Sequence, residues 1–242
     1  MDGGSAAVSR AGWLRPHAEQ LPDAPDIPGA GRTVGVLALQ GAFAEHAMAL
    51  RRLGAAVVEV RTPAELARVD SIVMPGGEST TISKLLATSG LFDPIRERLA
   101  AGMACLGTCA GMILLAVDVL DGRPDQRSFA ALDISVRRNG YGRQRDSFET
   151  DLVVSGLCDS AERDTPVHAV FIRAPRVTRV GPDVEVLARH GDDPVLVRSA
   201  RLLASAFHPE LTPDLRIHRL FLSLQTTDPV VATDPVVTTV IL

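Results

Sequence analysis

Short runs of consecutive apolar residues alternate, along the first half of the chain, with segments whose apolar residues recur at helical spacing. Residues 33–39 form such a run, typical of a buried parallel strand, and residues 42–53 place their apolar side chains on one helical face. The same alternation continues to residue 117. It predicts strands over 33–39, 56–60, 71–74 and 103–106, and helices over 42–53, 63–68, 80–88, 92–101 and 109–117.

The second half of the chain consists mostly of short strand patterns separated by turn residues. It predicts strands over 131–138, 150–154, 167–173, 184–188, 194–198 and 202–207, and a last helix over 213–225. Alternating strands and helices favour a parallel sheet. We therefore predict an α/β fold with three layers: a mostly parallel central sheet, helices on both faces and a small antiparallel extension.

Composition changes abruptly at both ends of this patterned region. Residues 1–31 contain five glycines and four prolines without periodicity, and residues 226–242 repeat Thr-Asp-Pro-Val-Val. We expect a flexible leader over 1–31, one folded domain over 32–225, and an irregular tail over 226–242.

Charge and cysteine content narrow the class of protein. The net charge of −4 gives no field that would draw the chain to nucleic acid, and no apolar stretch has the length of a membrane span. Cys105, Cys109 and Cys158 are an odd number of cysteines, which argues against a disulfide framework. We expect a soluble cytoplasmic protein that binds neither nucleic acid nor membranes.

The strongest chemical signal is Cys109, which lies within Gly-Thr-Cys-Ala-Gly directly after a predicted strand. Gly-x-Cys-x-Gly is the thiol form of the strand-to-helix turn called a nucleophile elbow. A second signal, Phe-His-Pro-Glu at 207–210, closes another apolar run. His208 would exchange a proton with the thiol, and Glu210 would orient His208. Taken singly, a cysteine in an apolar stretch is usually a small hydrophobic residue packed in the core, as we interpret Cys105. A single His-x-Glu is usually a solvent-exposed pair without a catalytic role.

A glycine pair follows the strand predicted at 71–74, in Pro-Gly-Gly-Glu-Ser-Thr. Amide hydrolysis needs N–H donors for the oxyanion, and we expect them from Gly77 and Ala110. A plain turn, with Ser79 or Thr80 capping the next helix, is the simpler alternative. A phosphate-binding loop is a weaker one, because the Gly-Lys-Ser/Thr ending is missing.

Charged residues elsewhere carry less information. Arg138 and Arg173 lie at predicted strand ends, where guanidinium groups suit the carboxylate of an amino acid, although surface ion pairs are the commoner use. Glu45 and His46 are neighbours on a predicted helix and point in different directions, so neither an acid–base pair nor a metal site is favoured. His168, His190 and His218 lack recognisable metal spacing. We expect no metal and no cofactor.

Together these segments resemble the class I, or triad, glutamine amidotransferases, and within them the glutaminase subunits of ribose-5-phosphate-dependent pyridoxal 5′-phosphate synthases. The resemblance covers about residues 33–225, and residues 1–31 and the tail after 225 depart from it. The segments that carry it are 39–41 with 45–46, 75–81, 107–111, 142–149, 171–175 and 207–210.

This resemblance implies a Cys-His-Glu triad of Cys109, His208 and Glu210 that releases ammonia from glutamine through a thioester. The glutamine contacts that it implies are Gly77, Glu78, Ser79, Arg138, Ile172 and Arg173. It also implies a hetero-oligomer in which ammonia passes to a barrel-shaped synthase subunit, docked in part on the turn at Gln40 and the first helix. An amidotransferase serving another synthase, a non-catalytic interaction subunit and a cysteine peptidase of similar fold are the alternatives.

Overall fold

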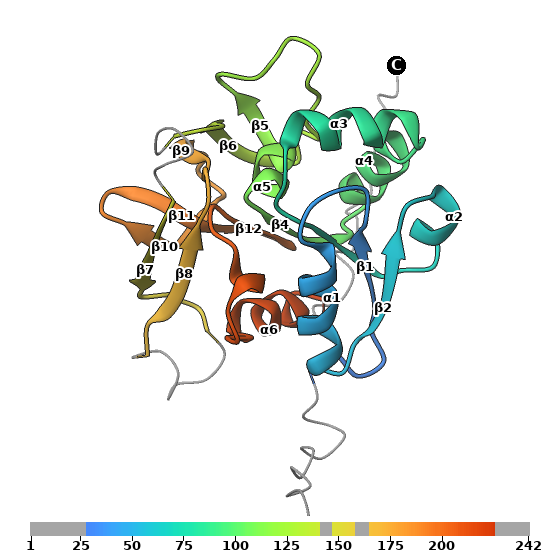
Figure 1. The fold of residues 1–242 in the computed structure, drawn as a ribbon, viewed down its shortest axis with the longest axis horizontal. Helices are drawn as coiled ribbons and strands as arrows, with labels where there is room; N and C mark the ends of the chain where they lie inside the picture. Colours follow the sequence, from blue (N-terminus) through green and yellow to red (C-terminus); the bar gives the residue numbers. More distant parts are fainter. Residues whose placement is uncertain (1–27, 141–146, 158–164, 226–242) are drawn as a thin grey trace, which may run out of the picture.

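The computed structural model describes residues 28–140, 147–157 and 165–225 (Figure 1). Its central sheet has seven strands in the order β10-β11-β12-β4-β3-β1-β2. The five strands from β12 to β2 run parallel, and β10 and β11 extend the sheet antiparallel. The strands are β1 (Thr33–Leu37), β2 (Ala56–Val60), β3 (Ser71–Met74), β4 (Ala104–Thr108), β10 (Glu185–His190), β11 (Asp193–Ser199) and β12 (Leu202–Ser205).

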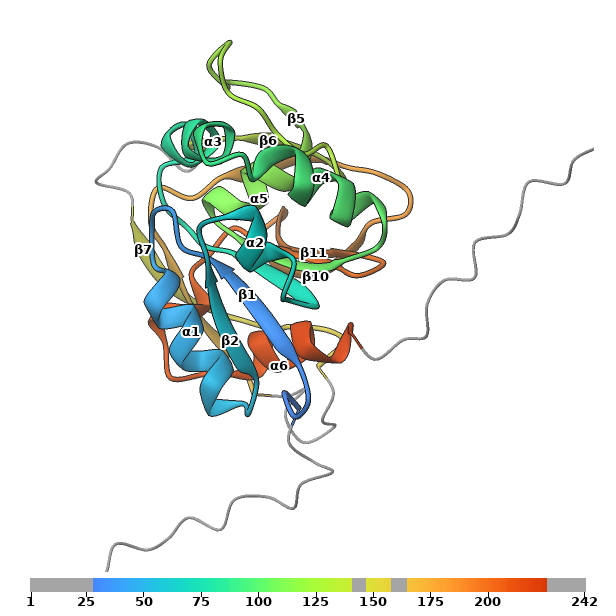
Figure 2. The ribbon, with the colours of Figure 1, turned by 90° about the vertical axis from the view of Figure 1, so that its right-hand side faces the viewer.

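Helices cover both faces of this sheet, as Figures 1 and 2 show from two directions. One face carries α1 (Phe43–Arg52) and α6 (Arg216–Ser223), and the other carries α3 (Ser79–Thr88), α4 (Phe92–Ala100) and α5 (Ala110–Leu115). The short α2 (Pro63–Leu66) lies beside β2 at the sheet edge. The predicted three-layer α/β architecture is confirmed.

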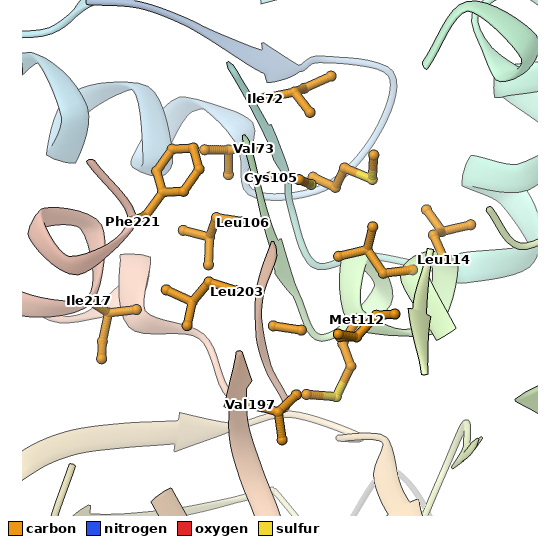
Figure 3. Close-up of a cluster of buried hydrophobic side chains, with 14 of the residues drawn as sticks. Ile72, Val73, Cys105, Leu106, Met112, Leu114, Val197, Leu203, Ile217 and Phe221 are labelled. Carbon is orange, nitrogen blue, oxygen red and sulfur yellow. The ribbon is translucent and has the colours of Figure 1, made fainter. Parts of the chain in front are cut away.

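Two apolar layers fill the space between the sheet and its helices. Figure 3 shows Leu106 and Leu203 of the sheet on the same side as Ile217 and Phe221 of α6. Met112, from α5, packs on the opposite side, and all of these side chains are at most 1% exposed. Because successive strand residues point to opposite faces, strands buried on both sides read as the continuous apolar runs seen in the sequence.

Two small sheets complete the fold. One has three strands, β5 (Ala116–Val119), β6 (Leu132–Arg137) and β9 (Arg176–Val180), and the other has two, β7 (Phe148–Leu152) and β8 (Val167–Phe171). The pattern missed β5 and β9. It extended a helix through residue 117, whereas α5 ends at Leu115 and the chain turns directly into β5.

The predicted leader and tail fall largely outside the described residues, as do Cys158 and the segment 141–146. Within the described part, Gly29 N–H donates to the carbonyl oxygen of Leu53 at 2.9 Å, so contacts with the domain begin before β1. No helix in the described ranges is long and apolar enough to cross a membrane.

Candidate active site

The turns that carry the candidate chemistry follow the carboxyl ends of neighbouring parallel strands. Gln40 comes after β1, Gly76 after β3, Cys109 after β4 and His208 after β12. Ligands of open α/β sheets bind at this edge. The fold therefore brings together segments that lie up to 168 residues apart between Gln40 and His208 (208 − 40).

Cys109 occupies a strained turn between β4 and α5. Its φ of 48° and ψ of −99° place a non-glycine residue in a region that side chains rarely adopt. Its neighbours must be small: a Cβ at Gly107 would lie 2.7 Å from the carbonyl carbon of Gly111, and one at Gly111 would lie 2.1 Å from the oxygen of Met74. The glycines of the elbow are thus required by close backbone approach.

The environment of Cys109 differs from that of Cys105. Cys109 is 6% exposed, and its Sγ lies 3.8 Å from the carbonyl oxygen of Ile172. Cys105 is fully buried in the core, and burial raises the pKa of its thiol. Because the thiolate is the reactive form, Cys105 is inert and Cys109 is the candidate nucleophile.

His208 lies beside Cys109 and is held by Glu210. Nδ1 of His208 is 2.7 Å from Oε1 of Glu210, and the backbone N–H of His208 donates to Val170 O at 2.9 Å. Burial disfavours the imidazolium, but hydrogen bonds to Cys109 and Glu210 outweigh it and raise the pKa of His208 to about 10. The pKa of Glu210 lies below its ordinary value, because interactions with His46 and His208 overcome the opposing effect of burial.

The loop after β3 packs tightly against these residues. A Cβ at Gly76 would lie 2.2 Å from Cε1 of His208, and a Cβ at Gly41 would lie 1.8 Å from the carbonyl oxygen of Gly76. Gln40 Oε1 accepts the backbone N–H of Glu78 at 2.9 Å. The turn at Gln40 is therefore bonded to the loop that contains Gly77, one of the two expected oxyanion donors.

A single pocket collects the expected glutamine contacts around Cys109. Its lining residues are Gly77, Glu78, Ser79, Cys109, Ile113, Arg138, Asn139, Ile172 and Arg173. Ala110, the other expected donor, is the first residue of α5, where backbone N–H groups have no partner within the helix. Segment 142–149 is described only from residue 147, so its other residues lie outside the described part.

Glu78 caps α3 and carries a bound arginine. Its carboxylate accepts the N–H groups of Thr80 at 3.2 Å and Thr81 at 2.6 Å, and Nη2 of Arg138 at 2.9 Å. Burial alone would raise the pKa of Glu78, but hydrogen bonds from Thr81 and Thr80 lower this pKa to about 2. The alternative of Ser79 or Thr80 as the cap is wrong, because the helix starts one residue earlier, with Ser79 as its first helical residue.

Arg173 and Arg138 are the two arginines among the residues that line the pocket. Arg173 has a φ of 46°, an unusual value for a side-chain-bearing residue and a common feature of functional sites. Nε of Arg138 is buried and has no hydrogen-bond partner among the described residues. A guanidinium with an unused donor is suited to an anionic group of a ligand.

Three buried residues lie behind Glu210, and the sequence did not predict that they adjoin the site. Nε2 of His46 lies 3.3 Å from Oε2 of Glu210 and 3.1 Å from Oγ1 of Thr108, and its Nδ1 lies 2.9 Å from Nε2 of His218. The available signal was a histidine on the apolar face of each of two helices. Within the described ranges, no group of His, Cys, Asp and Glu side chains could hold a metal ion.

Comparison with known proteins agrees with the fold and the site. Residues 36–226 match the SNO glutamine amidotransferase family, so the chain belongs to this family and is a glutamine amidotransferase. A similar crystal structure, described as a glutamine amidotransferase, is 51% identical, with a TM-score of 0.73 over 80% of this chain and 99% of that one. The PurLQS structure from Thermotoga maritima, at 16% identity and a TM-score of 0.57 over 79% of this chain and 97% of that chain, shares the fold.

Relatives at higher identity carry a more particular name. The chain is 57% identical over 191 residues to the pyridoxal 5′-phosphate synthase subunit PdxT of Parafrankia sp., covering 79% of this chain and 92% of the relative. It is 56% identical over 191 residues to the subunit of the same name from Mycolicibacterium smegmatis, covering 78% of this chain and 96% of the relative.

Proposed function

We propose that this chain is the glutaminase subunit of a pyridoxal 5′-phosphate synthase and that Cys109 is its nucleophile. The observation that carries the proposal is the strained Cys109 at the head of α5, in one pocket with Glu78, Arg138 and Arg173. The name carried by relatives that are 57% identical supports the pathway. The arrangement supports acyl transfer from a small amide substrate.

The first chemical step breaks the side-chain amide of glutamine. The Cys109 thiolate attacks the amide carbon, a C–S bond forms, and the carbonyl electrons move onto oxygen. His208, protonated at neutral pH because its pKa is raised to about 10, then gives its proton to the departing nitrogen. The C–N bond breaks, ammonia leaves, and a γ-glutamyl thioester remains on Cys109.

The second step frees glutamate. His208, now neutral, takes a proton from water as the water oxygen attacks the thioester carbon. The C–S bond breaks, glutamate leaves, and the proton on His208 restores the starting ion pair with Cys109. Glu210 holds His208 through Nδ1 during both steps, at the observed 2.7 Å.

Two sets of residues orient the substrate in this proposal. Backbone N–H groups of Gly77 and Ala110 face the developing oxyanion, where each donor contributes about 3 kcal/mol to the transition state. Arg138 and Arg173 bind the α-carboxylate, and the ionised Glu78 binds the α-ammonium group, with Ser79 and Ile172 completing the pocket.

Ammonia from this site passes to a barrel-shaped synthase subunit in a hetero-oligomer. Part of the docking surface is the turn at Gln40 with α1, where Met48 is 56% exposed. Docking there would act on the Gly77 loop through the bond between Gln40 and Glu78. We place this assembly in the cytoplasm, because the odd number of cysteines suits a reducing compartment.

The Cys109→Ala variant tests the assignment. Removing the sulfur abolishes thioester formation, so glutamate release in the presence of the synthase subunit should fall by at least about 1000-fold. Circular dichroism should show an unchanged fold, because alanine replaces a side chain of similar size. Cys105→Ala is the matched control and should retain activity. A Cys109→Ala protein with normal turnover would contradict the proposal and favour a non-catalytic interaction subunit.

A further inference from the structure

Behind the candidate triad lies a row of buried polar side chains that the mechanism above does not use. Thr108 ends β4, His46 lies on α1 and His218 on α6, and each is 0% exposed. α1 and α6 lie on the same face of the sheet in Figure 1, and their two histidines meet there at 2.9 Å. Buried polar groups on separate elements are costly unless each finds a partner, so this row requires an explanation.

The row ends at the oxygen of Glu210 that faces away from His208. Oε1 of Glu210 binds Nδ1 of His208, whereas Oε2 is buried and lies 3.3 Å from Nε2 of His46. The structure offers Oε2 no aligned hydrogen bond among the described residues. A buried carboxylate oxygen needs a nearby donor, and His46 is the one in place.

The distances define where the protons lie. A neutral imidazole donates from one nitrogen and accepts at the other. If His46 carried its proton on Nδ1, the lone pair of Nε2 would point toward the carboxylate, which is repulsive. A proton on Nε2 of His46 is instead aligned with Oγ1 of Thr108 and lies near Oε2 of Glu210, which is 3.3 Å from the nitrogen. Nδ1 of His46 then accepts from Nε2–H of His218. Nδ1 of His218 remains an unprotonated acceptor, and it has no partner among the described residues.

Charged forms of both histidines are disfavoured by their surroundings. Burial lowers the pKa of His46, opposed by Glu210 and Glu45 and assisted by His208. Burial also lowers the pKa of His218 to about 3, with His46 acting in the same direction and Glu210 and Asp214 opposing. Both rings are therefore neutral at physiological pH, whereas His208, whose pKa is raised, carries a positive charge next to Glu210.

We propose that His46, fixed by His218, is a positioning residue that donates Nε2–H to Glu210 and so holds the carboxylate in the orientation that pairs with His208. The inference rests on the proposed triad of Cys109, His208 and Glu210. His46 touches neither the thiol nor the substrate pocket, so its effect passes through Glu210. Without this donor the carboxylate is free to turn, and His208 loses the partner that defines its ring orientation.

Two substitutions at position 46 separate donation to Glu210 from filling of space. The amide nitrogen of glutamine reaches the position of Nε2 of His46, whereas that of asparagine reaches only the position of Nδ1. His46→Gln should therefore keep kcat within about threefold of wild type, while His46→Asn should lower it by about 10-fold to 100-fold, a range set by small misplacements of reacting groups. The KM for glutamine should change little in both variants, because the pocket is intact.

A second measurement follows His208 itself, by titrating its ring signals in NMR spectra of the free chain. In His46→Asn the pKa of His208 should fall toward its ordinary value, because an unanchored Glu210 stabilises the imidazolium less; in His46→Gln it should stay raised. Leu50→Val, one helical turn further along the buried face of α1, is the control for lost packing and should change neither kcat nor this pKa.

Equal losses of kcat in His46→Gln, His46→Asn and Leu50→Val would overturn the proposal, because they would indicate a purely structural role. Full activity of His46→Asn with an unchanged pKa of His208 would overturn it as well. The NMR titration reports on the pairing of His208 with Glu210 whether or not glutamine is the substrate. Normal turnover by Cys109→Ala would therefore contradict the glutaminase assignment, but the NMR titration would still show whether His46 positions Glu210.

Discussion

At the scale of single residues, the candidate site depends on close approaches that leave no room for a side chain. Gly107 and Gly111 allow the backbone of α5 to touch β3 and β4, and Gly76 admits the ring of His208. Cys109 itself adopts a φ of 48°, which costs about 1–3 kcal/mol and is retained only where surrounding contacts enforce it. The same contacts that strain the turn expose its sulfur to the pocket.

Gly76→Ala should disable the site without unfolding the protein. The added Cβ would lie 2.2 Å from Cε1 of His208, so the ring, clamped on its other side by Glu210, must move away from Cys109. We expect kcat/KM for glutamine to fall by about 100-fold. Gly122→Ala, where the nearest atom is 3.2 Å away, is the matched control for glutamate release. Equal activity of the two variants would show that His208 has more freedom than the structure indicates.

Residues of the candidate site that belong to a short sequence motif could be predicted. Residues that reach the site only through tertiary packing could not. Cys109 stands between two glycines, and His208 is two positions from Glu210, so the short motifs brought them to notice. His46 is 62 residues from Thr108 and 172 from His218. Only the packing of α1 on α6 and on the end of β4 brings these three together, and no periodicity specifies that packing.

At the scale of elements, the start of α3 links local helix chemistry to the pocket. The carboxylate of Glu78 satisfies two of the N–H groups that a helix leaves unpaired at its first turn. The same carboxylate binds Arg138, so one side chain caps a helix and orders a cation in the pocket. Glu78 therefore contributes both to the stability of α3 and to the lining of the candidate pocket.

Glu78→Gln should destabilise the protein by about 1 kcal/mol at pH 7, the usual cost of a lost N-cap. The pKa of Glu78 is lowered from 4.5 to about 2 in the folded protein. Its contribution is therefore complete above the unfolded pKa and is lost as the pH falls toward 2. Urea unfolding of both proteins between pH 7 and pH 3 should show the difference shrinking below about pH 4.5. Glu97→Gln, in α4, should match wild type at pH 7, and a pH-independent difference for Glu78→Gln would contradict the cap.

Most elements could be predicted because buried parallel strands and amphipathic helices have different periods. The strands that were missed, β5 and β9, lie where the sequence shows no clear strand or helix period. Residues 110–119 are apolar almost throughout, so the change from α5 to β5 at Ala116 leaves no mark in the pattern. β9 is only five residues long, between Pro175 and Gly181, and its adjacent polar residues Thr178 and Arg179 interrupt the alternation expected of a strand. It also pairs with a strand about 40 positions earlier, which no local pattern specifies.

At the scale of the whole molecule, the sheet order converts distant segments into one site. β12 is the last strand of the sequence, yet it lies between β4 and β11, which places His208 beside Cys109. The fold class followed from the alternation of strands and helices, whereas the insertion of β12 beside β4 did not. The family resemblance supplied the expectation that these segments meet.

The proposed docking surface includes the external face of α1. Met48 is exposed on a helix whose buried face carries His46 and Leu50, and α1 follows the turn that bonds Gln40 to the Gly77 loop. A single exposed apolar residue is common on protein surfaces, so Met48 serves here to mark the face of α1 that the proposed contact would cover. A synthase subunit docked on α1 would thus affect both the loop that contains Gly77 and His46, which we propose to hold Glu210 in place.

Met48→Asp should weaken docking of the pyridoxal phosphate synthase subunit while leaving the free chain unchanged. A charge placed in an apolar contact is poorly accommodated, so the Kd for the synthase subunit should rise by about tenfold or more, and half-maximal stimulation of glutamate release should need correspondingly more of it. Titration of the synthase subunit into a glutaminase assay measures both. Val153→Asp, at a position that is 74% exposed after β7, is the control and should titrate like wild type. Equal titration of Met48→Asp and wild type would move the docking surface away from α1, and a chain that no synthase subunit of this kind stimulates would serve a different ammonia-consuming enzyme.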